Sequence, residues 1–398
     1  MQRPLLGPGG LGAAALPEQD FAGRLALVRE AMGTAGCEGL LVSNLANVRY
    51  LTGFSGSAGQ VLVRGGDAVL VTDGRYATSA AGEVAGSGVR VEALPAAKQP
   101  ELLAELVAGT QRLALESEHV TWAQVRSWSE GWAQEPTLVP TSGLVEQFRE
   151  RKAPAELSRL AAAAAVADEA LARVLPALGD GPTEVEVAVA IEAEMRRLGA
   201  EAPAFATIVA SGPGGAEPHH HAGGRHIVPG DMVTIDFGAR VDGYCSDATR
   251  TVVAGAGAGG EARLPAELRR LYTVVLAAQD AGLSAVAAGV PAAQVDRACR
   301  EVVEAAGLGE LFVHGTGHGV GLLVHEAPAL SSTSTDVLAA GQVVTVEPGV
   351  YLPGVGGART EDTVVVGEAG CELLTLAPKA PVPPAAGRAP AWRGRGAG

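Results

Sequence analysis

Residues 234–251 read TIDFGARVDGYCSDATRT, and this stretch predicts a β-hairpin that brings two carboxylates together. The dipeptide Asp242-Gly243 is a strong signal for a two-residue turn, because both positions tolerate positive φ. Folding the chain there makes Asp236 and Asp247 diagonal neighbours on one face, roughly 7–8 Å apart at the backbone. Like charges held in this way shift each other's pKa unless a cation lies between them.

The register of this hairpin decides whether the two acids meet. A two-residue loop pairs Val241 with Tyr244 and, further along, Gly238 with Asp247. A slip of one residue would place Asp236 and Asp247 on opposite faces and remove the prediction.

Histidines that could complete a metal site lie in the same half of the chain. All eight except His119 fall between His219 and His325. His314, His318 and His325 flank or lie within a run in which glycine alternates from Gly315 to Gly321, a poor helix interior. We therefore expect extended chain with close backbone approach there.

Two further acids border apolar runs that are typical of buried strands. Glu347 follows residues 343–346, which read VVTV, and Glu361 precedes residues 363–366, which read TVVV. A buried carboxylate costs several kcal/mol unless it is paired or binds a metal, so both are candidate ligands.

These residues together resemble the pita-bread metallopeptidases of the M24 family, in particular the Xaa-Pro branch of aminopeptidase P and Xaa-Pro dipeptidase (prolidase). The resemblance covers the hairpin acids, His318, both glutamates, Pro218-His219, and the two flanking histidines. It implies a dinuclear centre in which two acids bridge the ions. The implied ligands are Asp236, Asp247, His318, Glu347 and Glu361, with Asp247 and Glu361 as the bridges.

The same resemblance implies the reaction and the catalytic groups. The expected activity is hydrolysis of Xaa-Pro peptide bonds, as an aminopeptidase or as a dipeptidase, through a hydroxide that bridges the two metals. Glu347 would also accept the proton of the attacking water. His314 and His325 would hydrogen-bond the carbonyl oxygen or tetrahedral intermediate, and His219 would contact the substrate. Arg359 is expected to pair with a nearby carboxylate, and His220 and His221 are expected to have no catalytic role.

The donor set favours manganese. Four carboxylates balance two divalent ions, and oxygen-rich ligation with one imidazole suits Mn²⁺ better than a thiolate-rich site would. Co²⁺ and Zn²⁺ are the expected substitutes. Two such ions lower the pKa of a shared water and polarise a carbonyl.

The amino-terminal part of the chain alternates helix and strand patterns. An apolar spacing of four, three and four residues from Phe21 predicts a helix, and strand-like runs follow. Residues 49–54 and 72–76 resemble a creatinase-like domain. We expect a tail over 1–18, an α/β creatinase-like domain over 19–148, an α+β pita-bread catalytic domain over 149–378, and a disordered tail over 379–398.

Composition excludes several classes of partner. The net charge of −14 offers no basic face for nucleic acid. The four cysteines form no C-x-x-C motif, which favours a reducing cytoplasm. No long apolar run predicts a transmembrane helix. The family resemblance implies a homodimer and a proline-containing peptide as substrate.

Two alternatives use the same fold without this chemistry. One is a metal-free creatinase-like amidinohydrolase, and the other is a non-catalytic peptide-binding module. The complete ligand set argues against both.

Overall fold

The structure is a computed structural model that describes residues 16–132, 136–255 and 264–380. Most of the two tails predicted at 1–18 and 379–398 lies outside these residues. The chain forms two compact units, Glu18–Arg149 and Glu150–Gly398, the second together with Met1–Pro17. In the described part of the chain, no helix is both long and apolar enough to cross a membrane.

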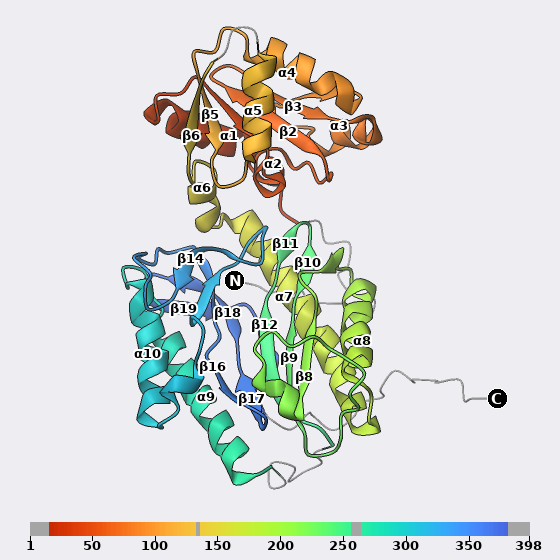
Figure 1. Ribbon diagram of the computed structural model, residues 1–398, viewed down its shortest axis with the longest axis vertical. Helices are drawn as coiled ribbons and strands as arrows, with labels where there is room; N and C mark the ends of the chain where they lie inside the picture. The colour runs from red at the N-terminus through yellow and green to blue at the C-terminus, as the bar shows by residue number, and fades with distance from the viewer. Residues whose placement is uncertain (1–15, 133–135, 256–263, 381–398) are drawn as a thin grey trace, which may run out of the picture. The chain divides into compact units, whose positions relative to one another are not determined.

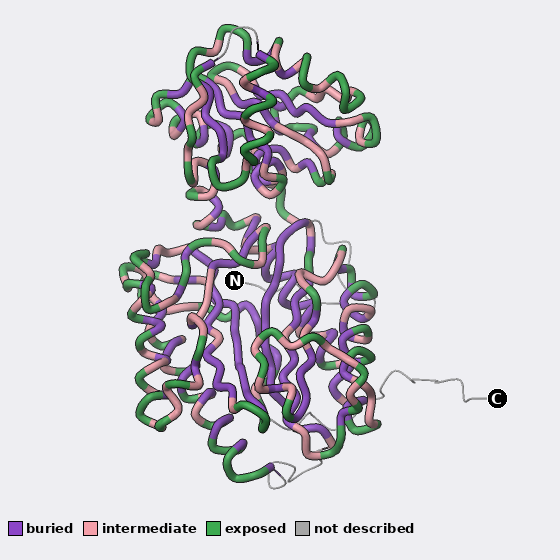
Figure 2. Tube along the Cα trace, in the orientation of Figure 1, coloured by how far each residue is buried: buried purple, intermediate pink, exposed green. Residues whose placement is uncertain are grey.

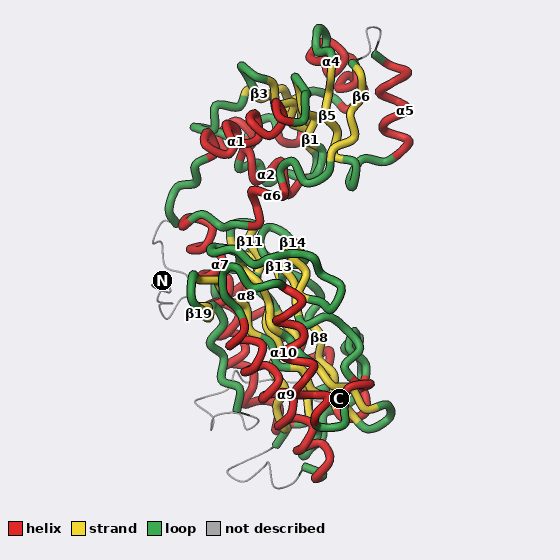
Figure 3. The backbone as a smooth tube through the Cα atoms, turned by 90° about the vertical axis from the view of Figure 1, so that its left-hand side faces the viewer, coloured by secondary structure: helices red, strands yellow, loops and turns green. Residues whose placement is uncertain are grey.

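The first unit is an α/β layer structure. Its six-stranded sheet has the order β4-β3-β2-β1-β5-β6, and Figure 3 shows α1 and α5 on opposite sides of it. The strands are β1 (Gly39–Val42), β2 (Gly59–Arg64), β3 (Ala68–Thr72), β4 (Arg90–Ala93), β5 (Arg112–Glu116) and β6 (Thr137–Thr141). The helices are α1 (Phe21–Thr34), α2 (Leu45–Thr52), α3 (Ser79–Glu83), α4 (Gln99–Val107), α5 (Trp122–Gly131) and α6 (Glu146–Glu150). The helix predicted from Phe21 is confirmed, because Leu25, Val28 and Met32 are buried.

The second unit places its strands between two pairs of helices (Figure 1). The helices are α7 (Pro154–Val174), α8 (Glu184–Arg197), α9 (Ala266–Ala285) and α10 (Ala292–Ala305). Helix α8 begins with a capping box, in which Thr183 and Glu186 each bond the other's backbone. A break before Pro291 separates α9 from α10.

The strands of the second unit form several small antiparallel sheets. Their orders are β11-β10-β7, β12-β9-β8, β14-β13-β15-β18-β19 and β16-β17. The first two contain β7 (Ala202–Pro203), β8 (Ile208–Ser211), β9 (Met232–Phe237), β10 (Ala239–Val241), β11 (Tyr244–Cys245) and β12 (Ala248–Val253). The others contain β13 (Gly317–Gly319), β14 (Glu326–Leu330), β15 (Val343–Val346), β16 (Gly349–Leu352), β17 (Gly356–Arg359), β18 (Asp362–Gly367) and β19 (Gly370–Leu373). Figure 2 shows that these strands are largely buried while the outer faces of the helices are exposed.

The central hairpin has the predicted register. Val241 pairs with Tyr244, and Thr249 pairs with Asp236, so the pairing continues without a slip. Asp242 has φ 45° and Gly243 has φ 82°, the positive values that a tight hairpin turn requires. This turn chemistry therefore places Asp236 and Asp247 on one face.

Candidate metal centre

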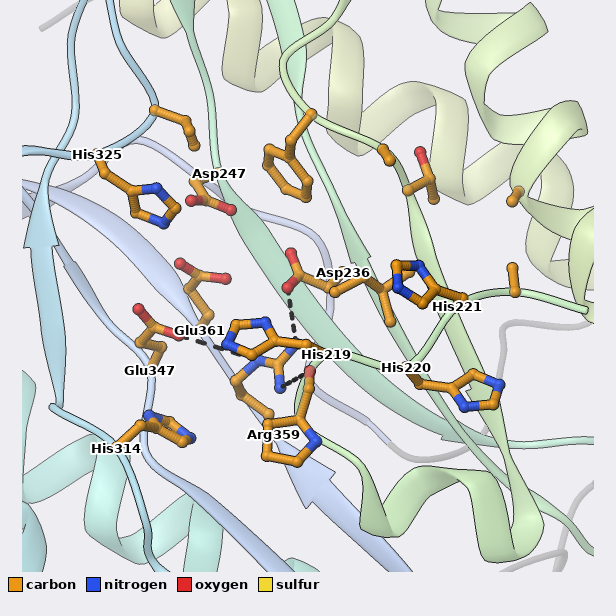
Figure 4. Close-up of a pocket in the computed structure, with 18 of the residues that line it drawn as sticks. His219, His220, His221, Asp236, Asp247, His314, His325, Glu347, Arg359 and Glu361 are labelled. Atoms are coloured by element: carbon orange, nitrogen blue, oxygen red, sulfur yellow. Dashed lines mark hydrogen bonds and ion pairs between the residues drawn. The ribbon is translucent and has the colours of Figure 1, made fainter.

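The five predicted ligands come from separate strands and converge on one cavity of about 700 Å³. Asp236 lies in β9, His318 in β13, and Asp247 directly before β12. Glu347 follows β15, and Glu361 precedes β18. Figure 4 shows the four carboxylates pointing toward one another across the cavity.

His318 lies between two of these carboxylates, those of Glu347 and Asp247. Its Nε2 lies 3.3 Å from Glu347 Oε1 and 3.7 Å from Asp247 Oδ2. One donor atom from each of Asp247, His318 and Glu361 lies within 4.8 Å of the others. This spacing is compatible with a shared cation.

The backbone fixes which imidazole nitrogen of His318 is available. Its Nδ1 donates to the carbonyl of Gly319 at 3.1 Å, so Nε2 keeps its lone pair and faces the carboxylates in the neutral form. Histidine ligands of metals are commonly oriented by such a bond from the other ring nitrogen. The irregularity in pairing between His318 and Gly319 lies at this point.

Within this cluster, and among the residues that the structure describes, the buried oxygens Asp236 Oδ1 and Glu361 Oε1 have no hydrogen-bond partner. The second oxygen of each acid is held, Asp236 Oδ2 by Arg359 at 2.6 Å and Glu361 Oε2 by the Thr249 hydroxyl at 2.8 Å. Buried polar atoms are normally paired, so these two oxygens call for a cation. The residues present therefore fit divalent metal ions.

The pKa values of the clustered carboxylates also indicate that this site favours a bound positive charge. Burial, together with the neighbouring Glu361, raises the pKa of Asp247 well above its ordinary value. Burial and the charge of Glu347 likewise raise the pKa of Glu361. For Glu347, burial opposes the charged form, but a protonated His318 and the charge of Arg359 together outweigh it and lower the pKa. A bound cation would relieve the repulsion among these carboxylates.

The three other predicted histidines surround the carboxylates (Figure 4). The ring of His325 packs edge-on against that of His318, with centroids 4.3 Å apart. Burial and the neighbouring His318 lower the pKa of His325. Burial also lowers the pKa of His314, so both imidazoles favour the neutral form.

Arg359 is paired, as predicted. Besides Asp236, its guanidinium donates to the Tyr351 hydroxyl at 2.7 Å and to the carbonyl of Pro218. Tyr351 in turn donates to His314 Nε2 at 2.9 Å, because His314 Nδ1 donates to Gly315 O. Burial raises the pKa of Tyr351 to about 12, so the phenol stays protonated.

Sequence analysis missed the part played by Tyr351. Its position four residues after Glu347 in β16 was the available signal, but only the tertiary structure brings it to His314 and Arg359.

His220, which follows His219 in the sequence, contacts acids outside the carboxylate cluster. Its Nε2 lies 2.9 Å from Glu184 and its Nδ1 lies 3.3 Å from Glu217. Burial opposes charge on this ring, but the interactions with Glu184 and Glu217 together outweigh it and raise the pKa of His220. With both nitrogens facing these acids, His220 is a poor candidate for a metal ligand.

Comparisons with known proteins assign the family. The model of metallopeptidase family M24 matches residues 158–368, and the creatinase/prolidase N-terminal domain model matches residues 24–151. The chain belongs to metallopeptidase family M24. The chain combines a creatinase-type α/β domain with the pita-bread catalytic fold, which confirms the fold predicted from the sequence.

Relatives of this M24 chain match over nearly its whole length. An uncharacterized peptidase YqhT of Bacillus subtilis is 38% identical over 89% of this chain and 98% of the relative. The structure of an Xaa-Pro dipeptidase from Bacillus anthracis has a TM-score of 0.85 at 37% identity, covering 91% of this chain and 99% of that one. An X-Pro aminopeptidase from Thermotoga maritima has a TM-score of 0.80 at 34% identity, covering 89% and 99%.

Substitution of Gly317 on β13 tests whether this strand holds His318 in position. A Cβ on Gly317 would meet the carbonyl oxygen of Thr345 at 2.1 Å, so Gly317→Ala must displace β13. We expect manganese affinity to fall about tenfold or more, the size of effect seen when a metal ligand is misoriented. Calorimetric titration of metal-stripped protein measures it.

Gly179→Ala is the matched control for this experiment, because a Cβ at Gly179 meets nothing within 4 Å. Equal manganese affinity in wild type and Gly317→Ala would show that β13 does not fix His318.

Proposed function

We propose that this chain is a manganese-dependent peptidase that hydrolyses the peptide bond before proline. The observation that carries the proposal is the pair of orphaned buried oxygens on Asp236 and Glu361, within a cluster that has four carboxylates and one imidazole. That donor set suits Mn²⁺, with Co²⁺ or Zn²⁺ as substitutes.

The side chains that would hold the ions are Asp236, Asp247, His318, Glu347 and Glu361. When bound, two divalent ions supply Lewis-acid polarisation of the carbonyl and a water of lowered pKa. Hydrogen bonds from Arg359 and Thr249 hold one oxygen of Asp236 and one of Glu361, which fixes the direction of the other.

The remaining steps are assigned to side chains around the cavity. We assign Glu347 to take the proton of the attacking water as a general base. We assign His325 to the carbonyl oxygen as it gains charge, and His219 to the substrate near the scissile bond. His314 donates through Nδ1 to the carbonyl of Gly315 and accepts from Tyr351 at Nε2, so these two bonds orient its ring at the edge of the cavity.

The preference for proline rests on the relatives. Solved structures similar to this chain are described as an Xaa-Pro dipeptidase and an X-Pro aminopeptidase. We infer the same substrate class, namely dipeptides or longer peptides with proline in second position. Relatives of this type and the full donor set make the metal-free amidinohydrolase and the binding module less favoured.

Further features of the proposal concern the protein as a whole. We infer a creatinase-like domain over 19–148 and the catalytic domain over 149–378, in a cytoplasmic homodimer. The cysteines support a reducing compartment, since Cys37, Cys245, Cys299 and Cys371 are thiols that form no disulfide bond. Sedimentation of the full chain measures the oligomeric state.

Release of free amino acid from Ala-Pro and Ala-Pro-Ala tests the activity. Metal-stripped protein is assayed with and without added Mn²⁺. Cleavage of the dipeptide alone identifies a dipeptidase, and cleavage of the tripeptide after alanine identifies an aminopeptidase. Inactivity on both substrates with Mn²⁺ bound would overturn the proline-directed function.

A further inference from the structure

One wall of the cavity is a face of α8 on which two valines are exposed. Four residues spaced i, i+3, i+4 and i+7 line the cavity, and we call them the α8 wall: Val185, Ala188, Val189 and Glu192. Val185 is 42% exposed and Val189 is 57% exposed. Large apolar side chains left exposed in a concave site usually contact a ligand.

The cavity that the α8 wall lines also contains apolar residues next to the metal-ligand candidates. Phe205 and Ile208 are half-buried and line the same cavity. Ile208 is paired across the sheet with the metal-ligand candidate Asp236. The apolar region therefore begins beside the place where the scissile bond would lie.

The far end of this wall is polar and incompletely bonded. Glu192 follows Val185 by two helical turns, about 10 Å along the axis. Its Oε1 lies 3.5 Å from the Thr207 amide and its Oε2 lies 3.9 Å from Arg196, both long contacts. The Thr207 hydroxyl, in a residue 7% exposed, has no hydrogen-bond partner. An acceptor-rich carboxylate and an orphaned hydroxyl thus lie side by side in the cavity lining.

We propose that the α8 wall with Thr207 is a subsite for a lysine or arginine side chain of the residue that precedes proline. This inference rests on the proposed function. The aliphatic stem of either residue can lie along the valines while its charged head reaches Glu192. A carboxylate and a hydroxyl acceptor match an ammonium or guanidinium donor.

The proline ring is not a suitable occupant of this subsite. It is compact and carries no donor, so it would leave Glu192 and the Thr207 hydroxyl without new partners. The two residues flanking the scissile bond are Xaa and proline, and the subsite adjoins Asp236. The side chain of Xaa is therefore assigned to it.

Three peptides and one conservative variant test the subsite. The Mn²⁺-loaded protein is assayed on Lys-Pro-Ala, norleucine-Pro-Ala and Ala-Pro-Ala, or on the matching dipeptides if only those are cleaved. Norleucine has the apolar stem without the ammonium group. We expect kcat/KM for lysine to exceed that for norleucine at least about tenfold, and Glu192→Gln to bring this ratio close to one. Ala-Pro-Ala, whose alanine has neither the stem nor the ammonium group, gives the reference rate for each protein.

The control is Glu301→Gln, which removes an exposed carboxylate from α10 and should leave the ratio unchanged. A ratio that is the same in wild type and Glu192→Gln would overturn the subsite. So would an equal loss on all three peptides, because Glu192 would then only support the Thr207 amide. No cleavage of any proline peptide by the wild type would instead overturn the proposed function.

Discussion

Asp247→Asn should abolish peptide hydrolysis, lowering kcat/KM by about a thousandfold or more, since merely misorienting a metal ligand costs about 10- to 100-fold. Asp247 Oδ2 lies 3.7 Å from His318 Nε2, and one donor atom from each of Asp247, His318 and Glu361 lies within 4.8 Å of the others. The substituted amide keeps the shape of the side chain but removes the negative charge that the ions require. Metal content after dialysis against Mn²⁺ and turnover of Ala-Pro-Ala are measured together.

Asp280→Asn serves as the control for that substitution, because Asp280 is exposed on α9 and its side chain is remote from the cavity lining. This variant should retain the metal content and turnover of the wild type. If Asp247→Asn bound manganese and turned over substrate as the wild type does, Asp247 would not be a ligand.

Arg250→Met should lower the free energy of unfolding of the second unit by about 3–5 kcal/mol, the usual cost of breaking a buried ion pair. Arg250 is 1% exposed and forms an ion pair with Asp362 at 2.8 Å. It also donates to the carbonyls of Thr249, Glu361 and Ala377. Methionine fills part of the volume but cannot donate to Asp362 or to the carbonyls of Glu361 and Ala377.

Urea unfolding followed by fluorescence and circular dichroism measures this loss. Arg240→Met in the same hairpin is the matched comparison, because Arg240 is 44% exposed and lies 3.5 Å from Glu201. An exposed pair of this kind contributes about 1 kcal/mol or less. Equal destabilisation by the two substitutions would contradict the role given to the buried arginine.

The hairpin and the acids on it could be predicted because their determinants are local. The Asp242-Gly243 turn sets the register, and register alone decides which face Asp236 and Asp247 share. The capping box at Thr183 and the break before Pro291 are local in the same sense. Each of these features depends on residues within a few positions of one another.

Other features of the site depend on contacts between distant segments. Arg250 reaches Asp362 and Ala377, which are more than 100 residues away in sequence. The α8 wall could not be predicted, because the spacing of Val185 and Val189 is also that of a helix face packed in the core. Only the tertiary structure places both valines in the lining of a cavity. The unbonded hydroxyl of Thr207 has no sequence signal at all.

Anomalous diffraction at the manganese absorption edge, from crystals of the wild-type protein grown with Mn²⁺, tests the two-metal centre most directly. Two peaks are predicted, about 3.5–4 Å apart, the usual spacing in two-metal sites. Both should lie among Asp236, Asp247, His318, Glu347 and Glu361, with Asp247 and Glu361 contacting both ions. The absence of any peak within this cluster, or a single peak that contacts neither Asp247 nor Glu361, would contradict the account.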